Sequence, residues 1–139
     1  MEYKTIDHKV FVRLDPGEEI VSCLQQLVSQ LEIRLGTITG IGATNNITLG
    51  LYNTQKKTYQ QHTFTGDHEI APLYGNITQM HGKPYLHLHI NICDEQNRSY
   101  CGHLNKAEIS VTFEGVIDVM EGSIERKKDT VTGLNILSI

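Results

Sequence analysis

Three histidines are the residues of this sequence whose types and spacing best suit chemistry. The segment 84–93 alternates between apolar and polar residues, which predicts a half-buried strand. Its aliphatic face comprises Leu86, Leu88, Ile90 and Ile92, and its polar face comprises Tyr85, His87, His89 and Asn91. His87 and His89 should therefore leave the same face of the strand, roughly 7 Å apart at the ~3.3 Å rise per residue of a strand.

The third histidine, His103, lies in the next predicted strand, 99–104, behind a turn at 94–98. An even pairing register would place His103 on the face of His87 and His89, and an odd register would place it on the far side. Leu104 suits the aliphatic face, which favours the even register. Three converging imidazoles bind Zn²⁺ well and leave a fourth position open, so we expect a site for zinc or another divalent metal.

Other residues are weaker candidates for the same site. Cys101 could be a fourth ligand or simply a small buried side chain. Glu69 could orient a ligating histidine by accepting its second N–H, and the adjacent His68 could line a pocket. The alternative for the whole set is that the histidines lie on a polar strand face and are merely solvated.

One helix is predicted to support the strands. The segment 15–18, Asp-Pro-Gly-Glu, offers an N-cap, a proline for the first helical position and a capping-box carboxylate. A single apolar stripe follows at helical spacing, and Gly36 is a plausible end signal. The stripe consists of Ile20, Val21, Leu24, Leu27, Val28 and Leu31.

Almost all the remaining sequence reads as short strands with short connections. The predicted strands are 9–14, 37–42, 47–52, 57–64, 69–79, 84–93, 99–104, 109–121 and 123–127, with a break at 44–46. Short connections leave no room for parallel crossovers. We therefore expect a single domain over residues 1–139 with an α+β fold, in which a curved, barrel-like antiparallel sheet packs against one long helix.

Composition narrows the classes of function. The 139 residues carry a formal charge of −4, and aromatic residues make up 6% of the chain. This acidic balance disfavours nucleic-acid binding by charge alone. No apolar run is long enough for a membrane helix, and the start of the sequence lacks the pattern of a signal peptide. The odd count of three cysteines argues against a disulfide framework, so we expect a reduced, cytoplasmic setting.

Several segments together resemble the plant and prokaryote conserved domain (PPC, DUF296), also described as the PD1-like DNA-binding domain. In chain order, these segments are Thr-Gly-Ile-Gly-Ala at 39–43, Gly-Leu-Tyr at 50–52, Tyr59, the run 66–75, Pro-Tyr-Leu-His-Leu-His at 84–89 and Gly-His-Leu at 102–104. The resemblance covers nearly the whole chain. It implies an antiparallel sheet with a packed helix and assembly as a homotrimer.

The resemblance also bears on function. Plant members carry an Arg-Gly-Arg core that enters the minor groove of A·T-rich DNA, and this sequence has no Arg-Gly-Arg. We therefore assign no nucleic-acid-binding residues. The fold is also similar to that of α-acetolactate decarboxylase, whose zinc is held by an H-x-H pair and one later histidine. His87, His89 and His103 match that pattern by type and order.

Three functions remain open from the sequence. The first is a trimeric, cytoplasmic metal-binding domain with a small-molecule or regulatory role. The second is a zinc-dependent lyase or hydrolase of a small carbonyl compound. The third is a DNA-binding regulator of A·T-rich sequences. Whether the protein is an enzyme is not decided at this level, and no membrane partner is expected.

Overall fold

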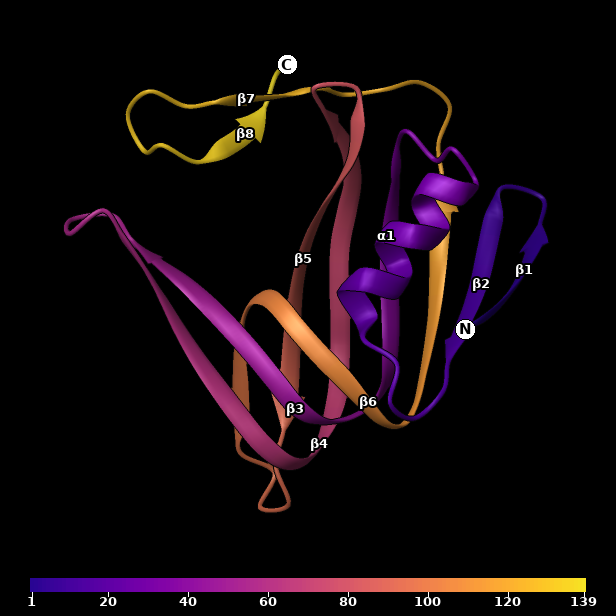
Figure 1. Ribbon diagram of the computed structural model, residues 1–139, viewed down its shortest axis with the longest axis vertical. Coiled ribbons are helices and arrows are strands. Elements are labelled where there is room, and N and C mark those ends of the chain that lie inside the picture. The colour runs from indigo at the N-terminus through magenta and orange to yellow at the C-terminus, as the bar shows by residue number, and fades with distance from the viewer.

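An antiparallel sheet with a single helix forms the body of the protein. The computed structural model describes residues 1–139, and Figure 1 shows the course of the chain. The elements are β1 (Glu2–Ile6), β2 (Lys9–Leu14), α1 (Ile20–Gln30), β3 (Gly36–Asn53), β4 (Thr58–Met80), β5 (Lys83–Cys93), β6 (Ser99–Val119), β7 (Arg126–Lys128) and β8 (Asn135–Leu137). No helix is long and apolar enough to span a bilayer.

The sheet curls because one long strand pairs on both sides. Its six strands run in the order β1-β2-β6-β3-β4-β5, and the first part of β6 also pairs with β5. Strands β3 to β6 therefore close into a partial ring, while β1 and β2 extend the sheet on one side. This arrangement confirms the expected α+β fold with a curved antiparallel sheet. The ring is incomplete, so the sheet is not a true barrel.

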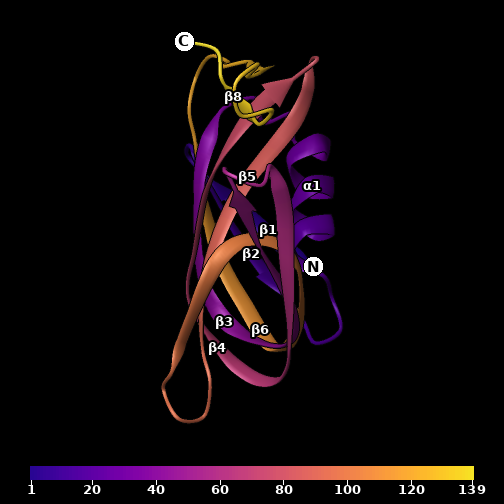
Figure 2. The same ribbon diagram turned by 90° about the vertical axis from the view of Figure 1, so that its left-hand side faces the viewer.

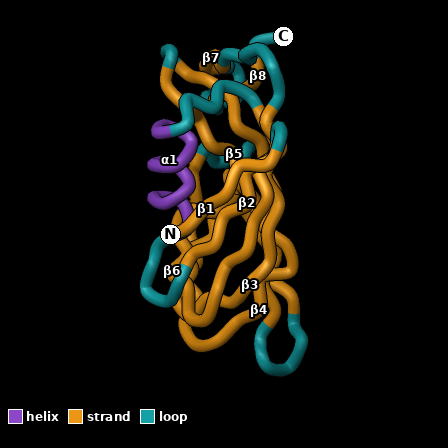
Figure 3. The backbone as a smooth tube through the Cα atoms, turned by 90° about the vertical axis from the view of Figure 1, so that its right-hand side faces the viewer, coloured by secondary structure: helices purple, strands orange, loops and turns teal.

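The core lies between helix α1 and one face of the sheet. Figures 2 and 3 show the helix packed along that face. The predicted apolar stripe is confirmed, because Ile20, Leu24, Leu27 and Val28 are fully buried. Strand β5 contributes alternate residues to the same core, namely Leu88, Ile90 and Ile92. The intervening polar residues of β5, the histidines included, must therefore lie on the opposite face of the sheet.

Both predicted ends of the helix are wrong. Asp15 does not cap it. Instead the segment 15–18 forms a turn, and the side chain of Glu19 accepts hydrogen bonds from the backbone N–H groups of Val21 and Ser22. The helix ends at Gln30, and Gly36 opens β3.

The strands are longer than their sequence signals. The predicted break at 44–46 is a β-bulge region inside one continuous β3, where the pairing register shifts. Likewise, the two strands predicted at 57–64 and 69–79 form one strand, β4. The two strands predicted at 99–104 and 109–121 form one strand, β6. Bulges carry turn-like residues without ending a strand, and they increase its bend. The sheet obtains its curl from these positions.

Two hairpins at the chain ends complete the fold. Strand β1 is exposed along its whole length, so it gave little apolar signal. Near the C-terminus, β7 and β8 pair into a small separate sheet, whereas a strand at 123–127 was expected. In Figure 1 this terminal hairpin lies across from the projecting end of the β3–β4 hairpin. The candidate site lies between these two hairpins.

Candidate metal centre

The three predicted histidines converge on the face of the sheet opposite the helix. His89 on β5 pairs directly with His103 on β6, which confirms the even register. The ring centroids are 5.2 Å apart for His87 and His89, 5.2 Å for His87 and His103, and 5.5 Å for His89 and His103. One potential ligand nitrogen from each ring lies within 4.8 Å of the others. Nitrogens at this spacing need only small rotamer adjustments to reach a common ion at ~2.0–2.1 Å.

A glycine on the neighbouring strand makes room for the wall of this site. Gly50 on β3 pairs with His103. A Cβ atom at position 50 would collide with the side chain of Tyr59 and would lie 2.7 Å from Nδ2 of Asn105. Without that atom, Tyr59 packs edge-on against His103 with a centroid separation of 6.4 Å and donates a hydrogen bond of 3.0 Å to Oδ1 of Asn105. Gly50 therefore permits the packing that positions His103.

The surroundings of His87 and His103 lower the pKa of both rings and favour the neutral form that metal binding requires. Burial is the main cause that lowers the pKa of His87 to about 4, and the charges of Arg126, His103 and His89 lower it further. Burial, followed by the charge of His89, also lowers the pKa of His103. The donor set contains three imidazoles and no carboxylate or thiolate. Neutral imidazoles are good ligands for zinc and for several other divalent transition metals, so the residues present fit such an ion.

A cavity of about 670 Å³ opens in front of the three histidines. Its walls come from the ends of β3 and β4, from β5 and β6, and from the terminal β7–β8 hairpin. The lining side chains are Leu51, Tyr52, Tyr59, Asn76, Tyr85, His87, His89, His103, Asn105, Arg126, Leu134, Asn135, Ile136 and Leu137, together with Gly50. No aspartate or glutamate is among them. The cavity thus combines a polar, histidine-lined part with an apolar rim.

Arg126 is the one cationic side chain of the cavity. It is only 7% exposed. Its guanidinium donates to Oγ1 of Thr78 at 2.8 Å, to the carbonyl oxygen of Asn135 at 2.8 Å and to Oδ1 of Asn76 at 2.7 Å. It also stacks on the ring of Tyr85, 4.6 Å from the centroid. These contacts fix the guanidinium and join the terminal hairpin to the sheet.

The structure does not bring the weaker candidates into this cluster. Cys101 is exposed and pairs with Asn91, one row beyond His103. Glu69 is exposed and pairs with Cys93, so it cannot orient the three rings. His68 is buried, but its Nδ1 lies 2.7 Å from the carbonyl oxygen of Gly66 and its ring packs near Phe64 and Tyr100. None of the three lines the cavity.

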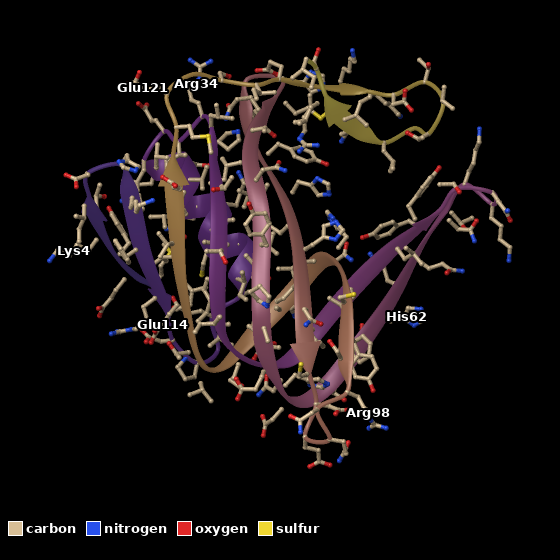
Figure 4. All side chains as sticks on the ribbon, turned by 180° about the vertical axis from the view of Figure 1, so that it is seen from behind. Lys4, Arg34, His62, Arg98, Glu114 and Glu121 are labelled. Atoms are coloured by element: carbon tan, nitrogen blue, oxygen red, sulfur yellow. The ribbon has the colours of Figure 1, made fainter.

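Several residues of the site were missed by the sequence reading. Tyr85 shares the polar face of β5 with His87, and this alternation was a usable signal. Arg126 and the terminal hairpin had no such signal, because they come from an irregular segment distant in sequence. Figure 4 shows that His62, in contrast, projects from the β3–β4 hairpin on the side away from the terminal hairpin. It is exposed and lies outside the cavity.

Comparison with solved structures places the fold among known relatives. A Bacteroides thetaiotaomicron protein, described as a candidate DNA-binding protein, is 35% identical, with 99% of this chain and 96% of that chain covered and a TM-score of 0.96. An Archaeoglobus fulgidus protein described as metal-containing is 28% identical, with 99% and 97% covered and a TM-score of 0.87. No curated protein gave a match.

A more distant likeness concerns the fold alone. A Staphylococcus aureus protein of unknown function, described as similar to α-acetolactate decarboxylase, is 14% identical, with 83% of this chain and 53% of that chain covered and a TM-score of 0.60. The expected similarity of fold is thus confirmed. Residues 1–121 match the family model of the Plants and Prokaryotes Conserved (PCC) domain. A match over most of the chain, together with the 35% identical relative that aligns over nearly all of both chains, shows that this protein belongs to the PCC domain family.

Proposed function

We propose that this PCC-domain protein binds one zinc ion per chain through His87, His89 and His103 and acts on or senses a small molecule in the adjoining cavity. The observation that carries the proposal is the convergence of three imidazole nitrogens within 4.8 Å of one another. The description of the A. fulgidus relative as metal-containing supports it. The three free cysteines are consistent with the reducing cytoplasm that we propose as its setting.

Metal content is the direct test of this proposal. Wild-type protein purified without added metal, then incubated with zinc and desalted, should retain about one equivalent by elemental analysis. A His87→Ala, His89→Ala double variant should retain none, since one imidazole cannot hold the ion. His62→Ala is the matched control, because it removes an exposed histidine outside the cavity. Equal zinc content in the wild type and the double variant would overturn the proposal.

We also propose that the chain assembles as a homotrimer. Exposed apolar residues on the sheet face opposite the helix support this. Phe11 pairs with Val116, Val116 with Thr39, and Thr39 with Tyr74, which forms a row across four strands. Phe11 is 43% exposed and Tyr74 is 60% exposed, and nearby Ile41 is 60% exposed. Val116 in this row is partly exposed and Thr39 is its one polar member, so we call it the apolar row. Exposed apolar residues gathered in this way are typical of a surface covered by another subunit.

A second candidate function is a zinc-dependent lyase or hydrolase of a small carbonyl compound. The cavity in front of the three histidines favours it, since no fourth protein ligand fills the site. When bound, zinc would act as a Lewis acid toward a carbonyl group. A general acid or base from this chain would have to be a tyrosine such as Tyr59, because no carboxylate lines the cavity. Turnover of small carbonyl compounds by zinc-loaded protein, lost in the double histidine variant, is the test.

DNA binding is the third candidate, and the description of the B. thetaiotaomicron relative favours it. The formal charge of −4 weighs against it, because affinity for DNA depends on neutralising phosphates. Binding of an A·T-rich duplex in a gel shift at low salt, weakening steeply with added salt, would support this candidate. We expect no shift.

A further inference from the structure

We propose that the cavity binds a small organic carboxylate with an apolar body, and that Arg126 is the residue that holds its carboxylate group. This inference rests on the proposed function, because it assigns a ligand class to the same cavity. It adds a residue that lies outside residues 1–121, the part of the chain matched by the family model.

The first step is the position of Arg126 relative to the histidines. Asn76 on β4 pairs with His87 on β5, and Thr78 pairs with Tyr85. The guanidinium of Arg126 hydrogen-bonds to Asn76 and Thr78 and stacks on Tyr85. It therefore lies over these two cross-strand pairs, beside His87 and next to the pair of Tyr74 and His89. Adjacent rows on one face of a strand are only ~6.6 Å apart.

The second step is the lack of a counter-charge. A buried cation is normally paired with a carboxylate. Arg126 is 7% exposed, yet all three of its side-chain hydrogen bonds go to neutral oxygens. No aspartate or glutamate lines the cavity that it faces. The three hydrogen bonds leave two of the five guanidinium N–H groups unassigned. A zinc ion on three neutral histidines would add two more positive charges, so the occupied cavity favours an anion.

The third step is the kind of anion. A planar guanidinium pairs well with a planar carboxylate through two parallel hydrogen bonds. The same cavity also has an apolar rim, with Leu51 from β3 and Leu134, Ile136 and Leu137 from the terminal hairpin, where Leu137 pairs with Arg126. Leu51 is 66% exposed and Leu134 is 41% exposed, so their side chains are available to a bound molecule. An inorganic anion would use none of this surface. A carboxylate with a branched aliphatic body would use both regions.

The test compares a carboxylate with its neutral analogue. Zinc-loaded protein of measured metal content is titrated by calorimetry with 4-methylpentanoate and with 4-methylpentanamide, which differ only in the charged group. We expect the carboxylate to bind at least tenfold more tightly than the amide and also more tightly than inorganic phosphate. Equal binding of carboxylate and amide, no binding of either, or a preference for phosphate would each overturn the inference.

Variants then assign the preference to Arg126. Arg126→Gln should weaken binding of 4-methylpentanoate at least tenfold while the zinc content stays unchanged. Lys127→Gln is the matched control, because it removes the same charge from the neighbouring, exposed position of β7. Arg126→Lys keeps the charge and should retain part of the preference for carboxylate over amide. Equal affinities in Arg126→Gln and Lys127→Gln would count against the role of Arg126.

Failure of the metal site would be seen separately. If elemental analysis finds no zinc in the wild type, the proposed function is wrong, and the same titrations are made on the metal-free protein. There Arg126 alone must produce the preference for carboxylate over amide, and its absence would overturn the inference as well.

Discussion

At the scale of single residues, the histidine cluster shows how strand alternation sets chemistry. His87 and His89 flank Leu88, whose side chain is buried in the core at 2% exposure. Burial of that leucine forces both histidines onto the opposite face. The surroundings of His87 then lower its pKa, because partial burial and nearby positive charge both disfavour the protonated ring. The features that make this ring a good ligand therefore have a cost, which is a less stable folded state at acid pH.

That cost predicts a pH dependence of stability in the metal-free protein. Because the folded state holds the pKa of His87 at about 4 instead of 6.5, the unfolded chain binds the proton more tightly between these values. Stability should therefore fall as the pH falls from about 6.5 to about 4. Each pKa unit of the shift corresponds to ~1.36 kcal/mol when no solvent screens the ring. Because the ring of His87 is partly exposed to solvent, we expect a smaller total effect, a loss of about 1–2 kcal/mol in the free energy of unfolding.

Urea denaturation of metal-free protein across this pH range measures the effect. A His87→Gln variant should lack this part of the pH dependence, and the difference between the two curves isolates it from other acid effects. Parallel curves for the wild type and the variant would contradict the prediction.

Gly50 gives a second prediction for a single residue. Gly50→Ala places a methyl group against Tyr59 and Asn105, so we expect a loss of about 1–3 kcal/mol in the free energy of unfolding. In a Tyr59→Ala background much of the collision is absent, and the cost should be smaller by about 1 kcal/mol. A double-mutant cycle by urea denaturation measures this coupling. Additive effects of the two substitutions would show that Tyr59 does not depend on Gly50.

At the scale of elements, helix α1 shows which parts of the fold are local. Its apolar stripe was readable because Leu24, Leu27 and Val28 recur at helical spacing. Its N-terminus was not readable, because the loop before it pairs with β6 through the backbone of Gly17, Glu18 and Ile109. This tertiary contact holds the segment 15–18 out of the helix, and Glu19 then becomes the cap. In addition, the Glu19 carboxylate accepts a hydrogen bond of 3.1 Å from the N–H of Ala107 on β6.

Substitution of this cap should therefore affect the whole protein. Glu19→Ala removes the acceptor for two helix N–H groups and for Ala107, and we expect a loss of about 1–2 kcal/mol in the free energy of unfolding. Glu121→Ala is the control, since Glu121 is an exposed carboxylate at the surface (Figure 4). Thermal or urea denaturation gives the comparison. Similar stability of the two variants would contradict the assignment of Glu19 as the cap.

The strands show a second limit of sequence information. The alternation around Leu104 favoured the face on which His103 lies but left the register open, and the pairing of His103 with His89 in the structure decided it. The three histidines were therefore predictable as candidates. The wall formed by Arg126 was not, because a guanidinium reaches Thr78 and Asn76 only after the chain has turned back across β4. Periodicity reports on neighbours within one element, and it carries no signal for contacts between residues about 50 positions apart.

The terminal hairpin is docked by a few polar contacts, which can be removed one at a time. The hydroxyl of Tyr52 donates a hydrogen bond of 2.8 Å to the carbonyl oxygen of Thr132, in the turn between β7 and β8. Tyr52→Phe should loosen the hairpin by about 0.5–1.5 kcal/mol and speed amide exchange in Asn135–Leu137. Tyr59→Phe is the matched control, because its hydroxyl bonds to Asn105 instead. Equal exchange in both variants would show that Tyr52 does not hold the hairpin.

At the scale of the whole molecule, the sheet separates three roles. One face packs against the helix and forms the core. The opposite face carries the histidines at the β5–β6 closure and the exposed apolar row from Phe11 to Tyr74. Tyr74 pairs directly with His89, so the row ends beside the candidate metal centre. A subunit packed on this row would lie next to the site without replacing any of its three ligands.

A charge placed on this exposed face should therefore disrupt assembly. Ile41→Glu introduces a carboxylate on a side chain that is 60% exposed beside the apolar row, and burying that charge in an interface would be costly. We expect the proposed trimer to dissociate at least tenfold more readily in the variant than in the wild type. Sedimentation or light scattering over a range of concentrations measures this dissociation. Val131→Glu is the matched control, since Val131 is 75% exposed near the tip of the terminal hairpin. A wild type that remains monomeric at all concentrations, or equal dissociation of the two variants, would show that this face is not the interface. Because the three histidines come from one chain, zinc content should stay near one equivalent per chain even in the dissociated variant.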